Sequence, residues 1–168
     1  LYTANDATVP ATWTNVVKGT EAITDINIID NYPFYAKTNI TFAAGKKVNY
    51  TRNCYIDGGW ENICVPFDVE TILDEDQAPV SNHIVQSLSE GDVLAFDETI
   101  IKANIPYIAS FPTGAAAETQ AEYTFTGSEI AQTGHLSLAN NNYSMTGVFK
   151  TQENIADTEG KYLLNGAG

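Results

Sequence analysis

Two cysteines are the residues of this chain best placed for covalent chemistry. The midpoint between Cys54 and Cys64 falls on Gly59, within the turn-like run Asp57-Gly58-Gly59. A hairpin that turns at this glycine would place the two sulfurs opposite each other, so we expect either a disulfide or, as the alternative, two reduced and partly buried thiols. A disulfide would indicate an oxidising compartment. Metal binding is the least favoured interpretation, because the Cys-x-x-Cys spacing is absent and both histidines lie far off in sequence.

A run of carboxylates, Asp74-Glu75-Asp76, offers hard oxygen ligands of the kind that calcium prefers. It lacks the Asp-x-Asp-x-Asp-Gly pattern and the distant Glu of a calcium loop, and such runs are more often solvated loops. A structural calcium ion at Asp74 and Asp76 is therefore the one cofactor we consider, and otherwise we expect none.

The sequence carries no sharp catalytic motif. Gly-x-Ser-x-Gly is absent, and His135 follows Gly134 in a stretch that has the composition of a turn. The 21 acidic residues make chance carboxylate pairs unavoidable, so no pair can be selected for glycoside hydrolysis. We therefore expect a protein without enzymatic activity.

Aromatic residues are a second candidate for ligand binding, since their faces pack well on the apolar face of a sugar ring. Of the two tryptophans, Trp60 follows Gly58-Gly59 at the start of an expected strand, which favours packing under the hairpin. Trp13 lies in a polar N-terminal arm and is the better candidate for exposure. Trp13 and Trp60 are the candidate ligand-binding residues.

Arg52 is the only arginine and shares a strand face with Tyr50 and Cys54. Burying a bare guanidinium is expensive, so an arginine among core-facing residues normally has a carboxylate partner or stacks on a ring. We expect a structural role for Arg52.

Chain length limits the number of domains, and net charge limits the kinds of partner. A chain of 168 residues, 43% of them hydrophobic, fits a single domain over residues 1–168. A net charge of −13 repels phosphate backbones and anionic lipid heads, which argues against nucleic-acid binding and peripheral membrane binding. The longest apolar runs, such as Ile105 to Phe111, fall far short of the roughly 20 residues of a membrane helix.

The composition favours short strands joined by Asn, Gly and Asp turns. Alternation supports this, since Val48 and Tyr50 fall on one face, as do Tyr123 and Phe125. We predict an all-β fold, a two-sheet antiparallel β-sandwich with one or two short helical turns. The predicted strands are Ala22–Ile29, Asn39–Phe42, Lys47–Cys54, Trp60–Val65, Val93–Phe96, Tyr107–Phe111, Glu122–Thr126, Tyr143–Lys150 and Lys161–Leu164.

Three segments fit this pattern less well. Asp68 is placed to cap a helical turn that ends at Leu73. The segment Asn82–Leu88 fits either a helix or an irregular strand, and residues 1–21 show the weakest periodicity and are expected to form a loosely packed arm.

Several short pieces of sequence occur in a fixed order between about Asn31 and Gly168. They are Tyr32-Pro33-Phe34-Tyr35, Phe42-Ala43, Val48-Asn49-Tyr50-Thr51-Arg52, Trp60, Ile63-Cys64-Val65-Pro66-Phe67-Asp68-Val69, Lys102-Ala103-Asn104-Ile105-Pro106-Tyr107-Ile108, Gly147-Val148-Phe149 and Gly160-Lys161-Tyr162-Leu163-Leu164. Together they resemble a β-sandwich module of exported, surface-associated proteins of gut Bacteroidetes, often appended to leucine-rich-repeat or other adhesin-like proteins.

The resemblance implies an extracellular, cell-surface or periplasmic module with a structural or adhesive role, whose partner is an unknown protein or glycan. It transfers no catalytic residue. Two alternatives stay open: a carbohydrate-binding module that uses exposed aromatics, and a fimbria-like assembly subunit. Family members are expected to continue past Lys161–Leu164 with another strand, so a chain that ends there would leave a sheet edge open to a partner's strand.

Overall fold

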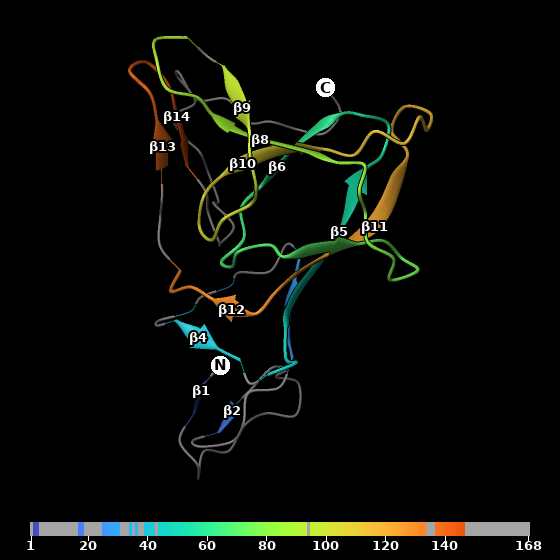
Figure 1. Ribbon diagram of the computed structural model, residues 1–168, viewed down its shortest axis with the longest axis vertical. Helices are drawn as coiled ribbons and strands as arrows, with labels where there is room; N and C mark the ends of the chain where they lie inside the picture. Colours follow the sequence, from blue (N-terminus) through green and yellow to red (C-terminus); the bar gives the residue numbers. More distant parts are fainter. Residues whose placement is uncertain are drawn as a thin grey trace, which may run out of the picture.

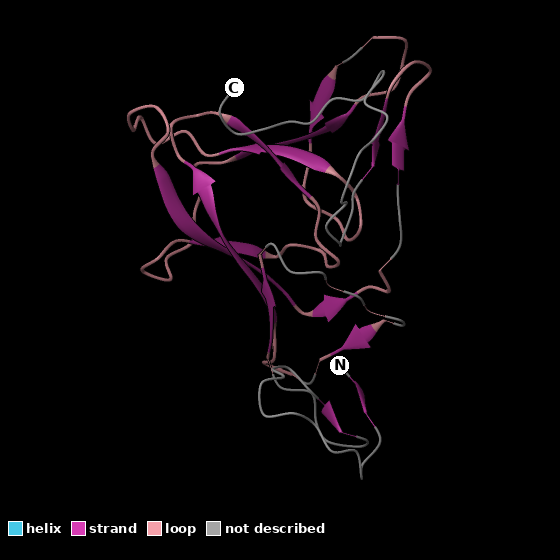
Figure 2. Ribbon diagram, turned by 180° about the vertical axis from the view of Figure 1, so that it is seen from behind, coloured by secondary structure: helices cyan, strands magenta, loops and turns pink. Residues whose placement is uncertain are grey.

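A computed structural model gives the fold of the chain (Figures 1 and 2). The structure describes residues 25–30, 34, 36, 39–42, 44–93, 95–133 and 137–146, together with the pairs 2–3 and 17–18. Within these residues the regular structure is entirely β, as predicted (Figure 2). No helix long and apolar enough to cross a membrane occurs among them.

Two four-stranded sheets form the body of the fold. The first has the order β6-β10-β8-β9, and all of its neighbours are antiparallel. The second has the order β3-β5-β11-β7, in which only β3 and β5 run parallel. Their bounds are Trp60–Ile63 (β6), Tyr107–Ser110 (β10), Ile84–Leu88 (β8), Phe96–Glu98 (β9), Ile26–Ile29 (β3), Val48–Tyr55 (β5), Gln120–Gly127 (β11) and Thr71–Leu73 (β7).

Three short strand pairs accompany the two sheets. Ile40–Thr41 (β4) pairs with Glu129–Ile130 (β12), and Ser137–Ala139 (β13) pairs with Ser144–Thr146 (β14), both antiparallel. Tyr2–Thr3 (β1) and Val17–Lys18 (β2) form a parallel pair in the N-terminal arm.

One hydrophobic core joins the two sheets, as a β-sandwich requires. The first sheet contributes Ile63, Val85, Tyr107 and Ala109, and the second contributes Ile26, Ile28, Val48, Cys54, Ile72, Tyr123 and Phe125. Between them Phe111 contacts Tyr123 and Phe125, with ring centroids 4.9 and 6.2 Å apart. The predicted core faces of the two longest strands, at Val48 and Tyr50 and at Tyr123 and Phe125, are therefore confirmed.

The predicted hairpin around Gly59 is wrong. β5 pairs with β3 and β11 in one sheet, whereas β6 pairs with β10 in the other (Figure 1). The segment 56–59 carries the chain from one sheet to the other, so β5 and β6 are not paired with each other. Asp57 fixes this crossing, because its carboxylate accepts hydrogen bonds from the backbone N–H groups of Gly59, at 2.9 Å, and Glu118, at 2.7 Å.

The predicted helical turn ending at Leu73 is also wrong, since Thr71–Leu73 form strand β7 against β11. Asp68 caps nothing there. Its carboxylate accepts hydrogen bonds from the Ala103 backbone N–H and from Lys102 Nζ instead. The β-branched Thr71 and Ile72 are better suited to a sheet, where Ile72 enters the core.

The ambiguous segment Asn82–Leu88 contains strand β8, and strands β1, β2, β12 and β13 were not predicted. The predicted strand Tyr143–Lys150 is described only as far as Thr146, where it contains β14. The predicted strand Lys161–Leu164 lies outside the described residues.

Gly127, at the end of β11, has no room for a side chain. A Cβ atom there would lie 2.6 Å from the Asp68 carbonyl oxygen and 2.7 Å from Phe67 Cδ2. Since Phe67 is fully buried, neither neighbour can move aside easily.

Substituting Gly127→Ala should therefore lower the free energy of unfolding by about 2 kcal/mol. Gly114→Ala is the control, because it adds a methyl group into open space at a φ of +79° and should cost about 1 kcal/mol. Denaturant unfolding measures both. An alanine at 127 that costs no more than one at 114 would show that Phe67 does not pack as described.

Candidate functional site

Cys54 lies buried on the core face of β5, and Cys64 is half-buried just after β6. Both are free thiols, so the disulfide expected from a hairpin is not formed. Cys54 lies in a strand of one sheet, and Cys64 follows a strand of the other. Burial raises the pKa of each thiol to about 12. Both are therefore protonated and poorly reactive at neutral pH.

The acidic run after β7 shapes a turn. Asp74 Oδ1 accepts hydrogen bonds from the backbone N–H groups of Asp76, at 3.0 Å, and Ala78, at 2.8 Å. Within the described part of the chain no group of three or more His, Cys, Asp or Glu residues could hold a metal ion. Asp74 thus has a role in the turn, and none of the residues that the structure describes completes a calcium site with Asp74 and Asp76.

Trp13 lies outside the described residues, but Trp60 is well placed in β6. Glu61 and Ile63 point into the sandwich, so the alternation of the strand turns Trp60 and Asn62 outward. The Trp60 side chain is 36% exposed, so the expectation that it packs under a hairpin is wrong.

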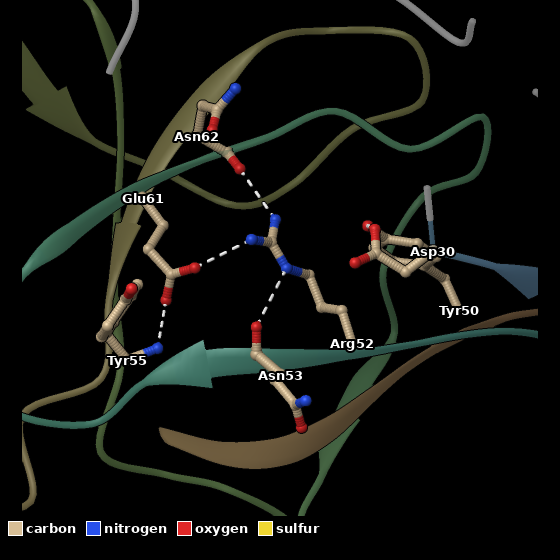
Figure 3. Close-up of polar contacts among 7 residues, drawn as sticks. All are labelled: Asp30, Tyr50, Arg52, Asn53, Tyr55, Glu61 and Asn62. Atoms are coloured by element: carbon tan, nitrogen blue, oxygen red, sulfur yellow. Dashed lines mark hydrogen bonds and ion pairs between the residues drawn. The ribbon is translucent and has the colours of Figure 1, made fainter. Parts of the chain in front are cut away.

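Arg52 links the two sheets (Figure 3). It lies on β5 directly after Thr51, the last residue of β5 that pairs with β3. Its guanidinium donates to Glu61 Oε2 at 2.8 Å and to the Asn62 carbonyl oxygen at 3.0 Å. The other carboxylate oxygen of Glu61 accepts the Tyr55 backbone N–H at 2.5 Å. We call these four residues the inter-sheet clasp. The structural role predicted for Arg52 is confirmed, with Glu61 as its carboxylate partner.

The clasp is mostly withdrawn from water, with the Glu61 side chain 6% exposed and that of Arg52 20% exposed. Burial raises the pKa of Glu61, although Arg52 and the Tyr55 N–H act in the opposite direction. Burial acts to lower the pKa of Arg52, but neighbouring acidic groups, Glu61 and Asp30 among them, raise it overall. Asp30 also accepts a 2.5 Å hydrogen bond from the hydroxyl of Tyr50, beside Arg52.

An acidic hollow of about 330 Å³ lies on the second sheet near the end of β11. Phe67, Ala103 and Ala131 line it together with the carboxylates of Asp68, Glu70 and Glu129. Two of these carboxylates bind the chain itself, Asp68 through Lys102 Nζ at 2.7 Å and Glu70 through Ser128 Oγ at 2.5 Å. Burial acts to raise the pKa of Asp68, but its hydrogen bonds with Lys102 and Ala103 lower it overall. The carboxylates of Asp68 and Glu70 therefore bind groups of the chain itself and stabilise the fold around the hollow.

Three consecutive asparagines hold the tip of the hairpin formed by β8 and β9. Asn140 Nδ2 donates to the Ser89 and Val93 carbonyl oxygens, and the side-chain amides of Asn141 and Asn142 bond to Asp92. Sequence analysis indicated only a loop at this run. Asparagine side chains often form hydrogen bonds with backbone N–H and C=O groups in turns. The run of three asparagines was therefore the feature of the sequence that could have indicated these contacts.

Comparison of the chain with protein-family models, with curated proteins and with solved structures finds no match. Function must therefore be inferred from the geometry and from the sequence pieces described above.

The clasp should behave as a coupled unit in a double-mutant cycle. Glu61→Leu or Arg52→Met alone leaves one buried charge without its partner and should lower the free energy of unfolding by about 3 kcal/mol. The double variant should lose less than the sum of the two by about 2 kcal/mol. Additive losses in denaturant unfolding would contradict the coupling.

Arg52→Met should also make stability depend on pH through Glu61. Without the guanidinium, burial is less opposed and the pKa of Glu61 rises further above its unfolded value. A raised carboxyl pKa gives stability that is present at low pH and lost as the pH rises through the folded pKa. The stability gap between Arg52→Met and the native chain should therefore be smaller at pH 4.5 than at pH 7.5. A gap that widens on acidification would refute this assignment.

Proposed function

We propose that this chain is a non-catalytic β-sandwich module of an exported protein, which acts at the cell surface in adhesion to a protein or glycan. The observation that carries the proposal is an outward-facing pair of apolar side chains on a rigid sheet. Trp60 and Ile84 are 36% and 37% exposed, and both stand opposite Ser110 in one cross-strand row. Exposed apolar side chains that gather in this way mark binding surfaces more often than isolated ones do.

The polar groups of the sandwich support a scaffold role. The clasp, the Asp57 crossing, the Asp74 turn and the asparagine run all bind their own chain. The sequence resemblance to surface-associated modules supports an extracellular, cell-surface or periplasmic location. Free cysteines are compatible with it, because thiols whose pKa is raised by burial oxidise slowly.

Assembly by strand addition has less support, because the chain itself occupies two of the outer sheet edges. Arg52 bonds the outer carbonyl oxygen of Asn62 on β6. Along β7, the Val80 N–H donates to the Ile72 carbonyl oxygen, and Leu73 forms a bridge with Pro79. A third edge strand, β9, has three residues and carries Asp97 and Glu98, features that discourage pairing with another chain.

Beads coated with the module should adhere to surfaces coated with matrix proteins or mucin, and Trp60→Ala with Ile84→Ser should reduce the adherent fraction several-fold. Val93→Ser is the matched control, because Val93 is 65% exposed in the loop between β8 and β9. Equal adhesion of all three proteins, or none by the native chain to any coating, would overturn the proposed function.

A further inference from the structure

Two exposed isoleucines lie next to each other at the open end of the hairpin formed by β8 and β9. The Thr99 N–H donates to the Val85 carbonyl oxygen at 2.9 Å, which continues the ladder one residue past the end of β9. Ile84 and Ile100 are the next residues along the two strands, and they are 37% and 63% exposed. Their neighbours Val85 and Ile101 lie in the core, so the alternation of the strands turns both isoleucines outward.

The next cross-strand row on the same side of the hairpin is polar. Gln86 and Glu98 lie two residues from the isoleucines and are paired with each other, so they point to the same side. Within the part of the chain that the structure describes, neither side chain makes a hydrogen bond or an ion pair. We call Ile84, Ile100, Gln86 and Glu98 the β8–β9 face.

The β8–β9 face is open to solvent, unlike the middle of the same sheet. On β10, Ile108 and Ser110 point to the same side but are only 7% and 3% exposed, so that strand offers little surface to a partner. None of the four residues of the β8–β9 face is buried. A partner would therefore approach from the side of β9, which is the outer strand of the sheet.

The row of two isoleucines favours a protein segment over a glycan. Aliphatic side chains cannot form hydrogen bonds, so a sugar hydroxyl placed on them would lose its hydrogen bonds to water and gain none. An apolar side chain of a partner protein would instead exchange water for an apolar contact, which is favourable in proportion to the area buried.

The charge beside the isoleucines selects among protein segments. Glu98 and its neighbour Asp97 are both exposed on β9, and the whole chain carries a net charge of −13. A lysine or arginine opposite Glu98 would form an ion pair with it, whereas an acidic partner would be repelled. A second copy of this acidic chain is therefore a poor occupant.

The distance between the two rows sets the shape of the segment. Successive rows on one side of a sheet lie about 7 Å apart along the strands, which is also the distance between residues i and i+2 of an extended chain. An extended segment that runs along the strands can thus place an apolar residue on the isoleucines and a basic residue, two positions away, at Glu98. Because it lies on the face, it adds no strand to the edge of β9.

We propose that the β8–β9 face binds an extended protein segment in which an apolar residue and a lysine or arginine lie two positions apart. Ile84 and Ile100 contact the apolar residue, and Glu98 pairs with the basic one. This assignment rests on the proposed adhesive function, extends its surface beyond Ile84 and names a protein as the partner.

NMR titration of the full chain with short peptides tests the site. The probe has three Val-Ser-Lys-Ser repeats, which place a lysine two positions after each valine. It should shift the signals of Ile84, Gln86, Glu98 and Ile100, and its affinity should fall as the salt concentration rises, because the ion pair is exposed. Peptides in which glutamate replaces lysine, or serine replaces valine, should bind about tenfold more weakly.

Ile100→Ser and Glu98→Gln should each weaken binding of the Val-Ser-Lys-Ser peptide about fivefold, because the first loses apolar contact area and the second loses the ion pair. The matched controls are Ile29→Ser and Glu75→Gln, which should bind like the native chain. Ile29 is a 54% exposed isoleucine on β3 of the other sheet, and Glu75 is an exposed carboxylate in the turn after β7. Ile100 lies outside the core, so the NMR spectrum of Ile100→Ser should remain that of the folded chain.

Three results would overturn the site. One is binding of the glutamate peptide as tight as that of the lysine peptide. Another is adhesion through Trp60 and Ile84 by a native chain that binds none of the peptides, which would leave the adhesive function standing without this site. The third is adhesion that disappears when the coating is deglycosylated, which would make a glycan the partner. A native chain that neither adheres nor binds peptide would reject the function together with the site.

Discussion

The sandwich depends on how its two sheets are held at the corner where β5 ends and β6 begins. Arg52 and Glu61 meet there between the inner faces of the sheets, with N and O atoms 2.8 Å apart (Figure 3). Burying both charges costs several kcal/mol per ion, so the pair is weak evidence for stability. Its value lies in specificity, because only one placement of β6 gives both Arg52 and the Tyr55 N–H their partner in Glu61. In a hairpin, backbone hydrogen bonds between paired strands would fix β6 relative to β5. Here the clasp has that role, because β5 and β6 are not paired.

This placement determines what the protein presents to solvent. Since Glu61 must point inward to reach Arg52, the alternation of β6 turns Trp60 and Asn62 outward. A shift of β6 by one residue would bury Trp60 and leave Arg52 without a carboxylate. The interior charge pair and the exterior aromatic residue are thus linked by a strand of four residues, and the register that forms the clasp also exposes Trp60.

The sequence was sufficient to predict the fold class and the core faces of β5 and β11, because alternation over long strands carries a strong signal. It failed where neighbours in space are distant in the chain. The run Asp57-Gly58-Gly59 has the composition of a hairpin turn, and nothing local distinguishes a turn back from a crossing to another sheet. Whether a strand is paired depends on its partners, so the short β7 was mistaken for a helical turn. Arg52 was expected to find a carboxylate, but 21 acidic residues gave no basis for choosing Glu61.

The candidate ligand residues illustrate the same limit. Trp60 was expected to be covered because a hairpin would have folded over it, and its exposure follows from the crossing instead. A surface assembled from residues of several strands leaves no linear motif, so it can be identified only once the strand order is known.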